Sequence, residues 1–411
     1  MRDLNPALEQ EFFDVFKRYC DLERDAGKQH DMSNYTLDRM IPLAEVAGHP
    51  ERGLKIIHVA GTKGKGTTCH FLSSLLSSCG KRVGLFTSPH LATVRERFQL
   101  DNALVDYETL LSSGRRLVSA VDSAGLKPSL FELFTVLGLR LFADSGVEYV
   151  VFETGIGGRL DATNYVTPVM TAITPISFDH VALLGNTIEL IASEKAGILK
   201  PSVPIVVSRQ SFSEAEDVIL ARARELGCPV LWPVNSEMTY PYLPYGTAPY
   251  LRENFCTSLS IVNHLGLVPD VGSFRYPQLR ARCERICDDP LVVLDAAHNG
   301  DSMRRLVEAL NLLYSGVRFT VVLGIVKGKD AHRIVEALRG LNARFVLTNP
   351  HTGKGSDLAA LAEEMRVAGL DVIEVRESIS SRDDLPYDGP LLFTGSFFTA
   401  LIGEELFSRD Q

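Results

Sequence analysis

A glycine-rich turn that contains a lysine follows a short apolar stretch near residue 60. The run is KIIHVAGTKGKGTTCHFLSSLL, residues 55–76. Gly61, Gly64 and Gly66 let the backbone fold closely around a polyanion, and a helix that starts after such a turn offers unpaired N–H groups. Lys65 adds a full positive charge. The pattern predicts a strand, a phosphate-binding loop and a helix, and hence a protein that uses a nucleoside triphosphate.

The turn departs from the general P-loop pattern. Val59 occupies the position of the first glycine, Gly66 replaces the Ser or Thr after the lysine, and Thr67 and Thr68 follow one position later. An ordinary strand-to-helix turn is the alternative. We expect the phosphate contacts to come from Gly61, Thr62, Lys63, Gly64, Lys65, Gly66 and Thr67.

Polar residues end several predicted strands of the same region. Ser88 follows LFT, Glu153 closes EYVVFE, and Asp179 and His180 follow TAITPISF. A carboxylate at a buried strand end beside a phosphate loop is suited to Mg²⁺, which prefers oxygen ligands. Singly, each has a simpler explanation: a turn serine before Pro89, a glutamate paired with an arginine, a loop histidine. Together with the phosphate loop, they favour metal binding.

Composition narrows the class of protein. The chain has 411 residues, 45% of them hydrophobic, and a formal net charge of −9, which predicts two or three folded domains and argues against a general nucleic-acid binder. Seven cysteines without CxxC spacing favour buried, reduced thiols. Because no leader follows Met1 and no apolar run approaches a membrane span, we expect a cytoplasmic protein that acts on small molecules, without membrane or nucleic-acid partners.

Strand-like and helix-like stretches alternate along most of the chain. After a helical region over 6–47, strands are expected at 55–61, 81–88, 147–155, 168–176 and 204–209, with helices at 65–79, 106–123, 131–145, 187–199 and 213–227. A Pro-, Tyr- and Gly-rich region with one helical stretch (251–267) precedes a second alternating unit. The expected fold class is α/β: a large P-loop ATPase domain with a mainly parallel sheet over 1–280, and a smaller Rossmann-like α/β domain over 281–411.

The segment GIGGRLDATN, residues 155–164, is similar to a dinucleotide fingerprint, but Leu160 occupies its sixth position. A simple glycine turn accounts poorly for its polar end. We expect a tight loop over the active site.

Seven motifs carry a resemblance to a known enzyme family. They are GTKGKGT (61–67), FTSPHL (86–91), FETGIGGRLDATN (152–164), DH (179–180), SEKAGI (193–198), LDAAHN (294–299) and GSFFTALIGEEL (395–406). Their order and spacing resemble those of the folylpolyglutamate synthase/dihydrofolate synthase family, ATP-dependent amide ligases of the Mur ligase superfamily. The resemblance implies a monomeric enzyme that adds L-glutamate to dihydropteroate or tetrahydrofolate through an acyl phosphate, in folate biosynthesis and one-carbon metabolism.

The resemblance also implies roles for single residues. Lys65 would contact the ATP phosphates, and Ser88, Glu153 and His180 would surround Mg²⁺. Lys195 would be carbamylated and bind a second Mg²⁺, although a surface helix lysine is the alternative; Lys65, Lys195 and His180 would act in catalysis. The remaining expected nucleotide contacts are Asn254, Arg282, Asp295 and His298, with Asn299 completing the last motif.

Three departures from the family pattern stand out. Lys63 replaces the usual asparagine of the loop, Ala281 replaces the glycine of a PGR segment, and YLREN replaces an HQ pair before Asn254. The alternatives are another amide ligase of the superfamily, against which GGRLDATN counts, and a nucleotide-binding regulator that has lost catalysis. By the same resemblance SPHL, FEL (131–133) and GGRLDATN would lie near a pterin substrate, with either or both folate reactions open.

Overall fold

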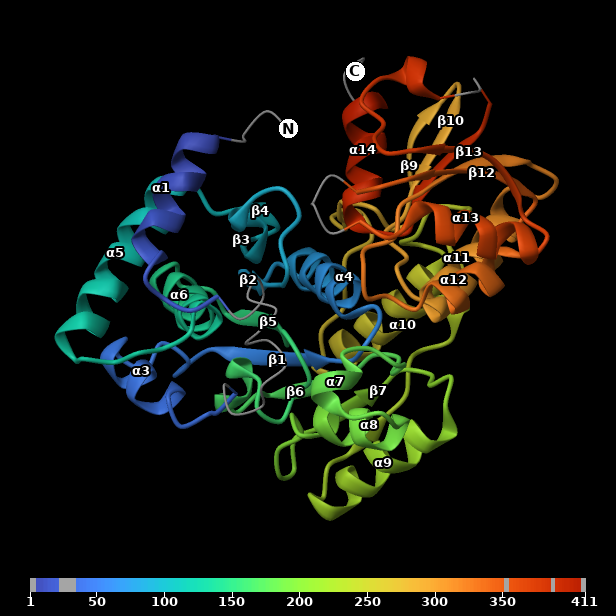
Figure 1. The fold of residues 1–411 in the computed structure, drawn as a ribbon. Helices are drawn as coiled ribbons and strands as arrows, with labels where there is room; N and C mark the ends of the chain where they lie inside the picture. Colours follow the sequence, from blue (N-terminus) through green and yellow to red (C-terminus); the bar gives the residue numbers. More distant parts are fainter. Residues whose placement is uncertain (1–4, 22–34, 351–354, 386–388, 408–411) are drawn as a thin grey trace. The chain divides into compact units, whose positions relative to one another are not determined.

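The computed structural model describes residues 5–21, 35–350, 355–385 and 389–407. The chain divides into two compact units, one of residues 1–245 with 251–277 and one of residues 246–250 with 278–411 (Figure 1). The division into domains at residue 280 that the sequence suggests stays a prediction.

An eight-stranded sheet forms the centre of the first unit. In spatial order its strands are β4 (Ala103–Leu104), β3 (Phe98–Leu100), β2 (Val83–Phe86), β5 (Tyr149–Glu153), β1 (Lys55–Ala60), β6 (Met170–Ile173), β7 (Ile205–Val207) and β8 (Val230–Leu231). Neighbours from β2 to β8 pair in parallel, whereas β3 and β4 form an antiparallel edge. The mainly parallel sheet predicted from the alternating pattern is confirmed.

Helices pack against this sheet. They are α1 (Pro6–Phe16), α3 (Met40–Val46), α4 (Lys65–Ser78), α5 (Tyr107–Ser123), α6 (Leu130–Asp144), α7 (Val181–Leu184), α8 (Ile188–Ala196), α9 (Ser213–Glu225) and α10 (Pro249–His264), with 3₁₀ turns at Val94–Arg97, Ala162–Tyr165 and Ser236–Thr239. Val151 and Phe152 point to opposite faces of β5 and are both fully buried, so both faces are covered.

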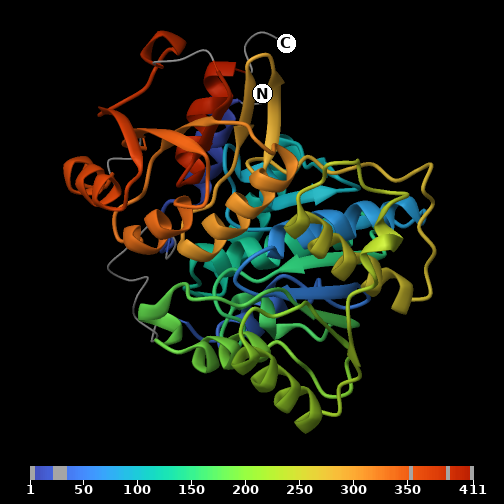
Figure 2. The same ribbon diagram turned by 90° about the vertical axis from the view of Figure 1, so that its right-hand side faces the viewer.

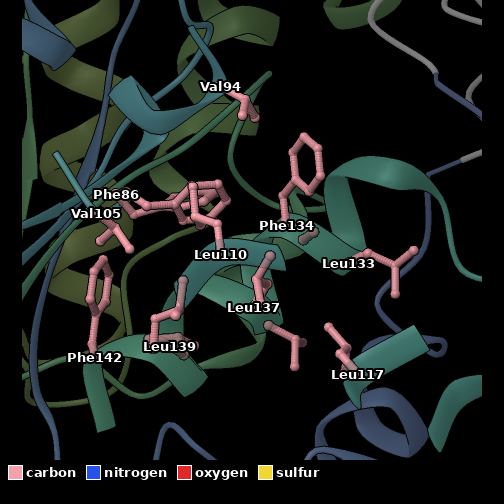
Figure 3. Close-up of a cluster of buried hydrophobic side chains, with 14 of the residues drawn as sticks. Phe86, Val94, Val105, Leu110, Leu117, Leu133, Phe134, Leu137, Leu139 and Phe142 are labelled. Carbon is pink, nitrogen blue, oxygen red and sulfur yellow. The ribbon is translucent and has the colours of Figure 1, made fainter. Parts of the chain in front are cut away.

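A cluster of aromatic and aliphatic side chains fills the space between one face of the sheet and the helices α1, α3, α5 and α6. Phe86 of β2 and Phe134 and Phe142 of α6 belong to it (Figure 3). This core anchors the strands whose carboxyl ends carry the predicted site.

The helical region expected over 6–47 is only partly helical. Helix α1 ends at Phe16 and α3 begins at Met40, while 17–21 and 35–39 are turns or irregular, and 22–34 lie outside the described residues. The apolar pattern of α1 alone, with Phe12 and Phe16 buried, gave the correct helix.

A six-stranded sheet forms the second unit. In spatial order its strands are β13 (Asp371–Arg376), β12 (Ala343–Thr348), β11 (Phe319–Leu323), β14 (Leu391–Thr394), β10 (Leu291–Leu294) and β9 (Glu284–Asp288), parallel except for β9. Its helices are α11 (Gly300–Leu313), α12 (Ala331–Leu338), α13 (Leu358–Val367) and α14 (Phe397–Phe407), with a 3₁₀ turn at Arg382–Asp384. α14 packs on one face and α11, α12 and α13 on the other (Figure 2). This second α/β sheet also agrees with the expected fold class.

All seven cysteines are free thiols, of which Cys69, Cys228 and Cys256 are buried and the other four half-buried. Among the residues that the structure describes, no helix combines the length and the hydropathy needed to cross a membrane.

Candidate active site

The phosphate loop connects β1 to α4. Gly61 and Gly64 have φ angles of 148° and 81°, which favour glycine. A Cβ atom on Gly61 would lie 1.9 Å from Thr174 Oγ1, and one on Gly64 would lie 2.4 Å from Asn254 Oδ1. The loop therefore needs glycine at both positions, and Asn254 of α10 packs directly against it.

Backbone groups of the loop are held by the segment after β6. The N–H groups of Thr62 and Lys63 donate to Pro175 O at 3.1 and 3.0 Å. Helix α4 begins at Lys65 and has no side-chain cap at Gly64, so unpaired N–H groups and the positive end of the helix lie at the loop. This arrangement suits an anion, and Lys65 adds a full charge beside it.

A buried carboxylate lies beside the loop. Glu153, the last residue of β5, is only 3% exposed, and its Oε2 accepts the Ser88 N–H at 3.1 Å. A Cβ atom on Gly66 would lie 3.4 Å from the same oxygen. Because β5 lies between β1 and β2, three neighbouring parallel strands bring Ser88, Gly66 and Glu153 together at their carboxyl ends.

Lys195 contacts the loop from α8. It is 4% exposed and donates from Nζ to Gly61 O at 2.9 Å. Burial lowers the pKa of Lys195 to about 7, and the positive charge of Lys65 acts in the same direction. A substantial fraction of Lys195 is therefore an uncharged amine at neutral pH, the form that reacts with carbon dioxide.

The loop over residues 155–164 packs along α8. The Arg159 N–H donates to Glu194 O at 2.7 Å, and the Arg159 guanidinium pairs with the Glu194 carboxylate at 2.8 Å. The Asn164 amide donates to the carbonyl oxygens of Arg159 and Gly197, each at 3.0 Å. A Cβ atom on Gly158 would lie 2.7 Å from Glu194 O. The motifs GGRLDATN and EKAGI thus form one packed unit that fixes the backbone next to Lys195.

Asp179 and His180 follow β6 at the same edge of the sheet. His180 has a φ angle of 48° and is exposed, and Asp179 pairs with Lys63 at 3.4 Å. Within the described ranges, no group of three or more His, Cys, Asp and Glu side chains is spaced to hold a metal ion. A magnesium site here has to combine Glu153 with other oxygen donors, and the Ser88 hydroxyl and a carbamate on Lys195 are of that kind.

A buried series of hydrogen bonds joins His58, Thr163 and Asp161, and the sequence analysis did not predict it. His58 of β1 is fully buried, and its Nε2 lies 2.8 Å from Thr163 Oγ1. The Thr163 hydroxyl in turn donates a hydrogen bond to Asp161 Oδ1. His58 Nε2 therefore carries the ring hydrogen and donates it to Thr163 Oγ1, because the Thr163 hydroxyl hydrogen is already donated to Asp161. Burial lowers the pKa of His58 to about 3, so the ring is neutral. The sequence did contain a signal for this buried residue, because His58 is the one polar residue inside the apolar stretch IIHVA of β1.

Two pockets lie in the first unit, and the first of them includes Asp161. One is lined by Tyr35, Thr36, Ser129, Phe131, Glu132, Gly155, Ile156, Leu160, Asp161 and Ala162. The other, which is smaller, is lined by Phe13, Asp21, His90, Arg97, Leu130, Phe131 and Phe134. Phe131 lines both pockets, and the larger one combines an aromatic ring with a buried carboxylate.

In the second unit, Asp295 follows β10 and is 5% exposed. Its carboxylate accepts the Tyr250 hydroxyl, the Cys283 N–H and the Ala297 N–H, each at 2.8 Å. Burial raises the pKa of Asp295, whereas the charge of nearby Arg282 opposes that shift. Tyr250 is a further residue that the sequence analysis did not predict.

The neighbours of Asp295 are also fixed by hydrogen bonds and stacking. His298 Nδ1 lies 2.9 Å from Ala296 O, and the Asn299 side chain caps α11 by accepting the Ser302 N–H at 2.9 Å. The Arg282 guanidinium stacks 4.6 Å from the centre of the Phe397 ring. His298 Nδ1 therefore carries a hydrogen, which fixes the tautomer and the orientation of the ring.

Ala281, which stands where the resembled family has glycine, has a φ angle of 51°. An alanine carries strain of about 1 kcal/mol in this left-handed region, which explains why glycine suits the position.

A glycine-rich phosphate loop at the end of a central parallel strand, with a buried glutamate beside it and a second α/β unit, defines the class: a P-loop enzyme of two α/β units that uses ATP. The comparisons agree. Residues 281–388 match the family model described as Mur ligase, glutamate ligase domain. The chain is 33% identical to the dihydrofolate synthase/folylpolyglutamate synthase of Bacillus subtilis over 404 residues, which cover 88% of this chain and 92% of the relative.

Solved structures of the same group share the whole fold. Mycobacterium tuberculosis folylpolyglutamate synthase, complexed with ADP and AMPPCP, has a TM-score of 0.83 at 26% identity and covers 98% of this chain and 99% of its own. E. coli FolC in complex with DHPP and ADP has a TM-score of 0.79 at 26% identity, covering 92% and 94%. The chain belongs to the folylpolyglutamate synthase/dihydrofolate synthase family.

Proposed function

We propose that this protein catalyses the ATP-dependent ligation of L-glutamate to dihydropteroate, to a reduced folate, or to both. The observation that carries the proposal is the convergence of the phosphate loop, Glu153 and Lys195 at one edge of the sheet, with Lys195 Nζ 2.9 Å from Gly61 O, in a chain of this family. ATP use follows from the same loop.

The reaction explains why such a site is needed. A carboxylate is a poor electrophile and repels the triphosphate that it must attack, so positive charge has to neutralise both while the γ-phosphoryl group is transferred. We assign this work to Lys65, to the N–H groups at the start of α4 and to bound metal. The product is an acyl phosphate, whose carbonyl the glutamate amine then attacks as phosphate leaves.

For the metal we propose Ser88, Glu153 and His180 as the residues around one Mg²⁺, and a carbamate on Lys195 as a ligand of a second. Support comes from the buried Glu153 carboxylate and from the depressed pKa of Lys195, about 7, which favours the reactive amine. Mg²⁺ supplies charge neutralisation when bound. Exposed His180 is the weakest member of this set by its chemistry, because magnesium prefers oxygen.

The remaining nucleotide contacts are proposed from the resemblance to the family, and the positions of the side chains support them. We propose Asn254, which packs against Gly64, and in the second unit Arg282, Asp295 and His298. The side chains of Arg282, Asp295 and His298 contact neighbouring residues, which suits residues that must meet a ligand in a fixed orientation.

For the acceptor substrate we propose the pocket whose lining includes Phe131, Leu160 and Asp161. An aromatic face and a carboxylate suit a flat heteroaromatic ring that carries N–H donors. Seven free thiols agree with action in the reducing cytoplasm. We propose that the enzyme acts as a monomer, by resemblance to the family.

Incubation with ATP, Mg²⁺ and L-glutamate plus either dihydropteroate or tetrahydrofolate, followed by mass spectrometry, tests the proposal. A glutamate-sized gain on dihydropteroate alone identifies a dihydrofolate synthase, a gain on the folate alone a polyglutamate synthase, and gains on both a bifunctional enzyme. Absence of a gain on either substrate would refute the proposal and favour another ligase reaction of the superfamily.

A further inference from the structure

Lys63 is a second lysine inside the phosphate loop, two residues before Lys65. Its side chain is 14% exposed, and its backbone N–H donates to Pro175 O at 3.0 Å. The loop residue is therefore held in place by its main chain. An ammonium group at such a position is costly unless an anion accompanies it.

Lys63 forms an ion pair with Asp179. Lys63 Nζ lies 3.4 Å from Asp179 Oδ2, and the Asp179 side chain is 18% exposed. Charge-assisted N–H to O contacts in proteins are typically about 2.7–2.9 Å, so this contact is a long one. The other Asp179 oxygen accepts the His180 N–H at 3.1 Å and is used in the turn. A triphosphate, with several oxygens and more charge, would compete well for the Lys63 ammonium.

The charges around the loop are close enough to influence one another. The pKa of Lys195 is lowered to about 7 by burial and then by Lys65, with Lys63 acting in the same direction and Asp179 in the opposite one. Lys195 itself contacts Gly61 O at 2.9 Å. Lys63 belongs to the glycine-rich turn, Lys65 begins α4 directly after it, and Asp179 is joined to the turn by its contact with Lys63.

We propose that Lys63 is a second phosphate-binding lysine, which exchanges Asp179 for the nucleotide and supplies part of the positive charge that Mg²⁺ otherwise supplies. The inference rests on the proposed ATP-dependent function and gives Lys63, one of the expected loop contacts, a specific role: it exchanges one anion for another and reduces the need for magnesium. Because an ammonium group and a magnesium ion would both neutralise the negative charge of the phosphates, the presence of Lys63 would lower the magnesium concentration that nucleotide binding needs.

Calorimetric titration of the full-length protein with a non-hydrolysable ATP analogue, at low and at saturating Mg²⁺, tests this inference. We expect Lys63→Asn to weaken binding by about tenfold at low Mg²⁺, the loss of one charged hydrogen bond, and by much less at saturating Mg²⁺. Lys63→Arg should retain most of the affinity. Asp179→Asn should bind at least as tightly as the wild type at low Mg²⁺, because the internal competitor is removed.

The matched control is Lys81→Asn. Lys81 also forms an ion pair, with Glu148 at 3.2 Å, but it precedes β2 and so lies at the opposite edge of the parallel strands; its replacement should leave binding unchanged. Equal affinities for the wild type and Lys63→Asn at low Mg²⁺, with a lowered melting temperature in both Lys63→Asn and Asp179→Asn, would reduce the pair to a structural ion pair and overturn the inference. A wild type that binds no analogue would instead overturn the proposed function as well.

Discussion

At the scale of single residues, burial changes the protonation and hence the reactivity of Lys195. The same side chain on an exposed helix would be an ordinary cation, whereas here desolvation lowers its pKa to about 7. A carbamate would restore a negative charge next to Lys65 and provide oxygen for metal.

Replacement of Lys195 tests this chemistry. Lys195→Ala should lose ligase activity, because a metal ligand is gone, and millimolar formate or acetate should restore part of it. The measurement is turnover with and without the small acid. Formate should not rescue Lys65→Ala, which lacks a cation rather than an oxygen ligand. An unmodified amine in a fully active wild-type protein would contradict the carbamate.

Lys65 provides the second residue-scale prediction. Lys65→Ala should abolish ligation while the melting temperature changes little, because a half-buried loop lysine contributes to transition-state charge more than to packing. Turnover, nucleotide affinity and melting should be measured together. Lys55→Ala, which removes a lysine paired with Glu148 on the surface, is the control. Near-normal turnover of Lys65→Ala would remove the phosphate-loop assignment.

His58 predicts a pH dependence of stability. Its folded pKa of about 3 lies below the ordinary value of 6.5, so the unfolded state binds the proton more readily and stability falls as pH drops from 6.5 toward 3. The loss by pH 4 should be about 3 kcal/mol. His58→Gln should flatten this slope in denaturant titrations, whereas His332→Gln, at an exposed site, should not. If the free energy of unfolding of the wild type and of His58→Gln changed equally with pH, the predicted contribution of His58 would be wrong.

At the scale of elements, the loop over 155–164 and α8 act as a single packed unit. Gly158→Ala would bring a Cβ atom to 2.7 Å from Glu194 O. The loop and α8 would then have to separate, which would displace the backbone next to Lys195. We expect a stability loss of about 1–3 kcal/mol together with lower activity. Gly272→Ala, whose nearest neighbour would lie at an ordinary 3.6 Å, is the matched control. A fully active and stable Gly158→Ala would refute the packing argument.

At the scale of the whole molecule, we predict that residues of the second unit take part in the reaction. His298→Ala should reduce turnover more than stability, because His298 is only half-buried and contributes little to the core. Asp295→Ala should also cost stability, about 1–3 kcal/mol, because three donors lose their acceptor; Asp295→Asn separates the two effects. Turnover and melting of the three variants check this. A His298→Ala protein with normal turnover would exclude the residue from the site.

The sequence by itself determined the features that are contiguous along the chain. The phosphate loop, its flanking strand and helix, and the alternating elements of both sheets follow from glycine positions and from hydrophobic periodicity, which act over a few residues. Short or polar elements were missed: β9 is mostly half-exposed, β4 has two residues, and neither carries an apolar repeat. The strand ends also marked Ser88 and Glu153 correctly as neighbours of the loop.

Only the tertiary structure decided which distant groups meet. The contact of Lys195 Nζ with Gly61 O joins residues 134 positions apart, and His58 meets Thr163 across 105 positions. Such contacts depend on the order of strands in the sheet and on side-chain packing, which no local pattern encodes. The pKa of Lys195 belongs to the same category, because it is burial, supplied by the whole fold, that turns an ordinary lysine into a reactive amine.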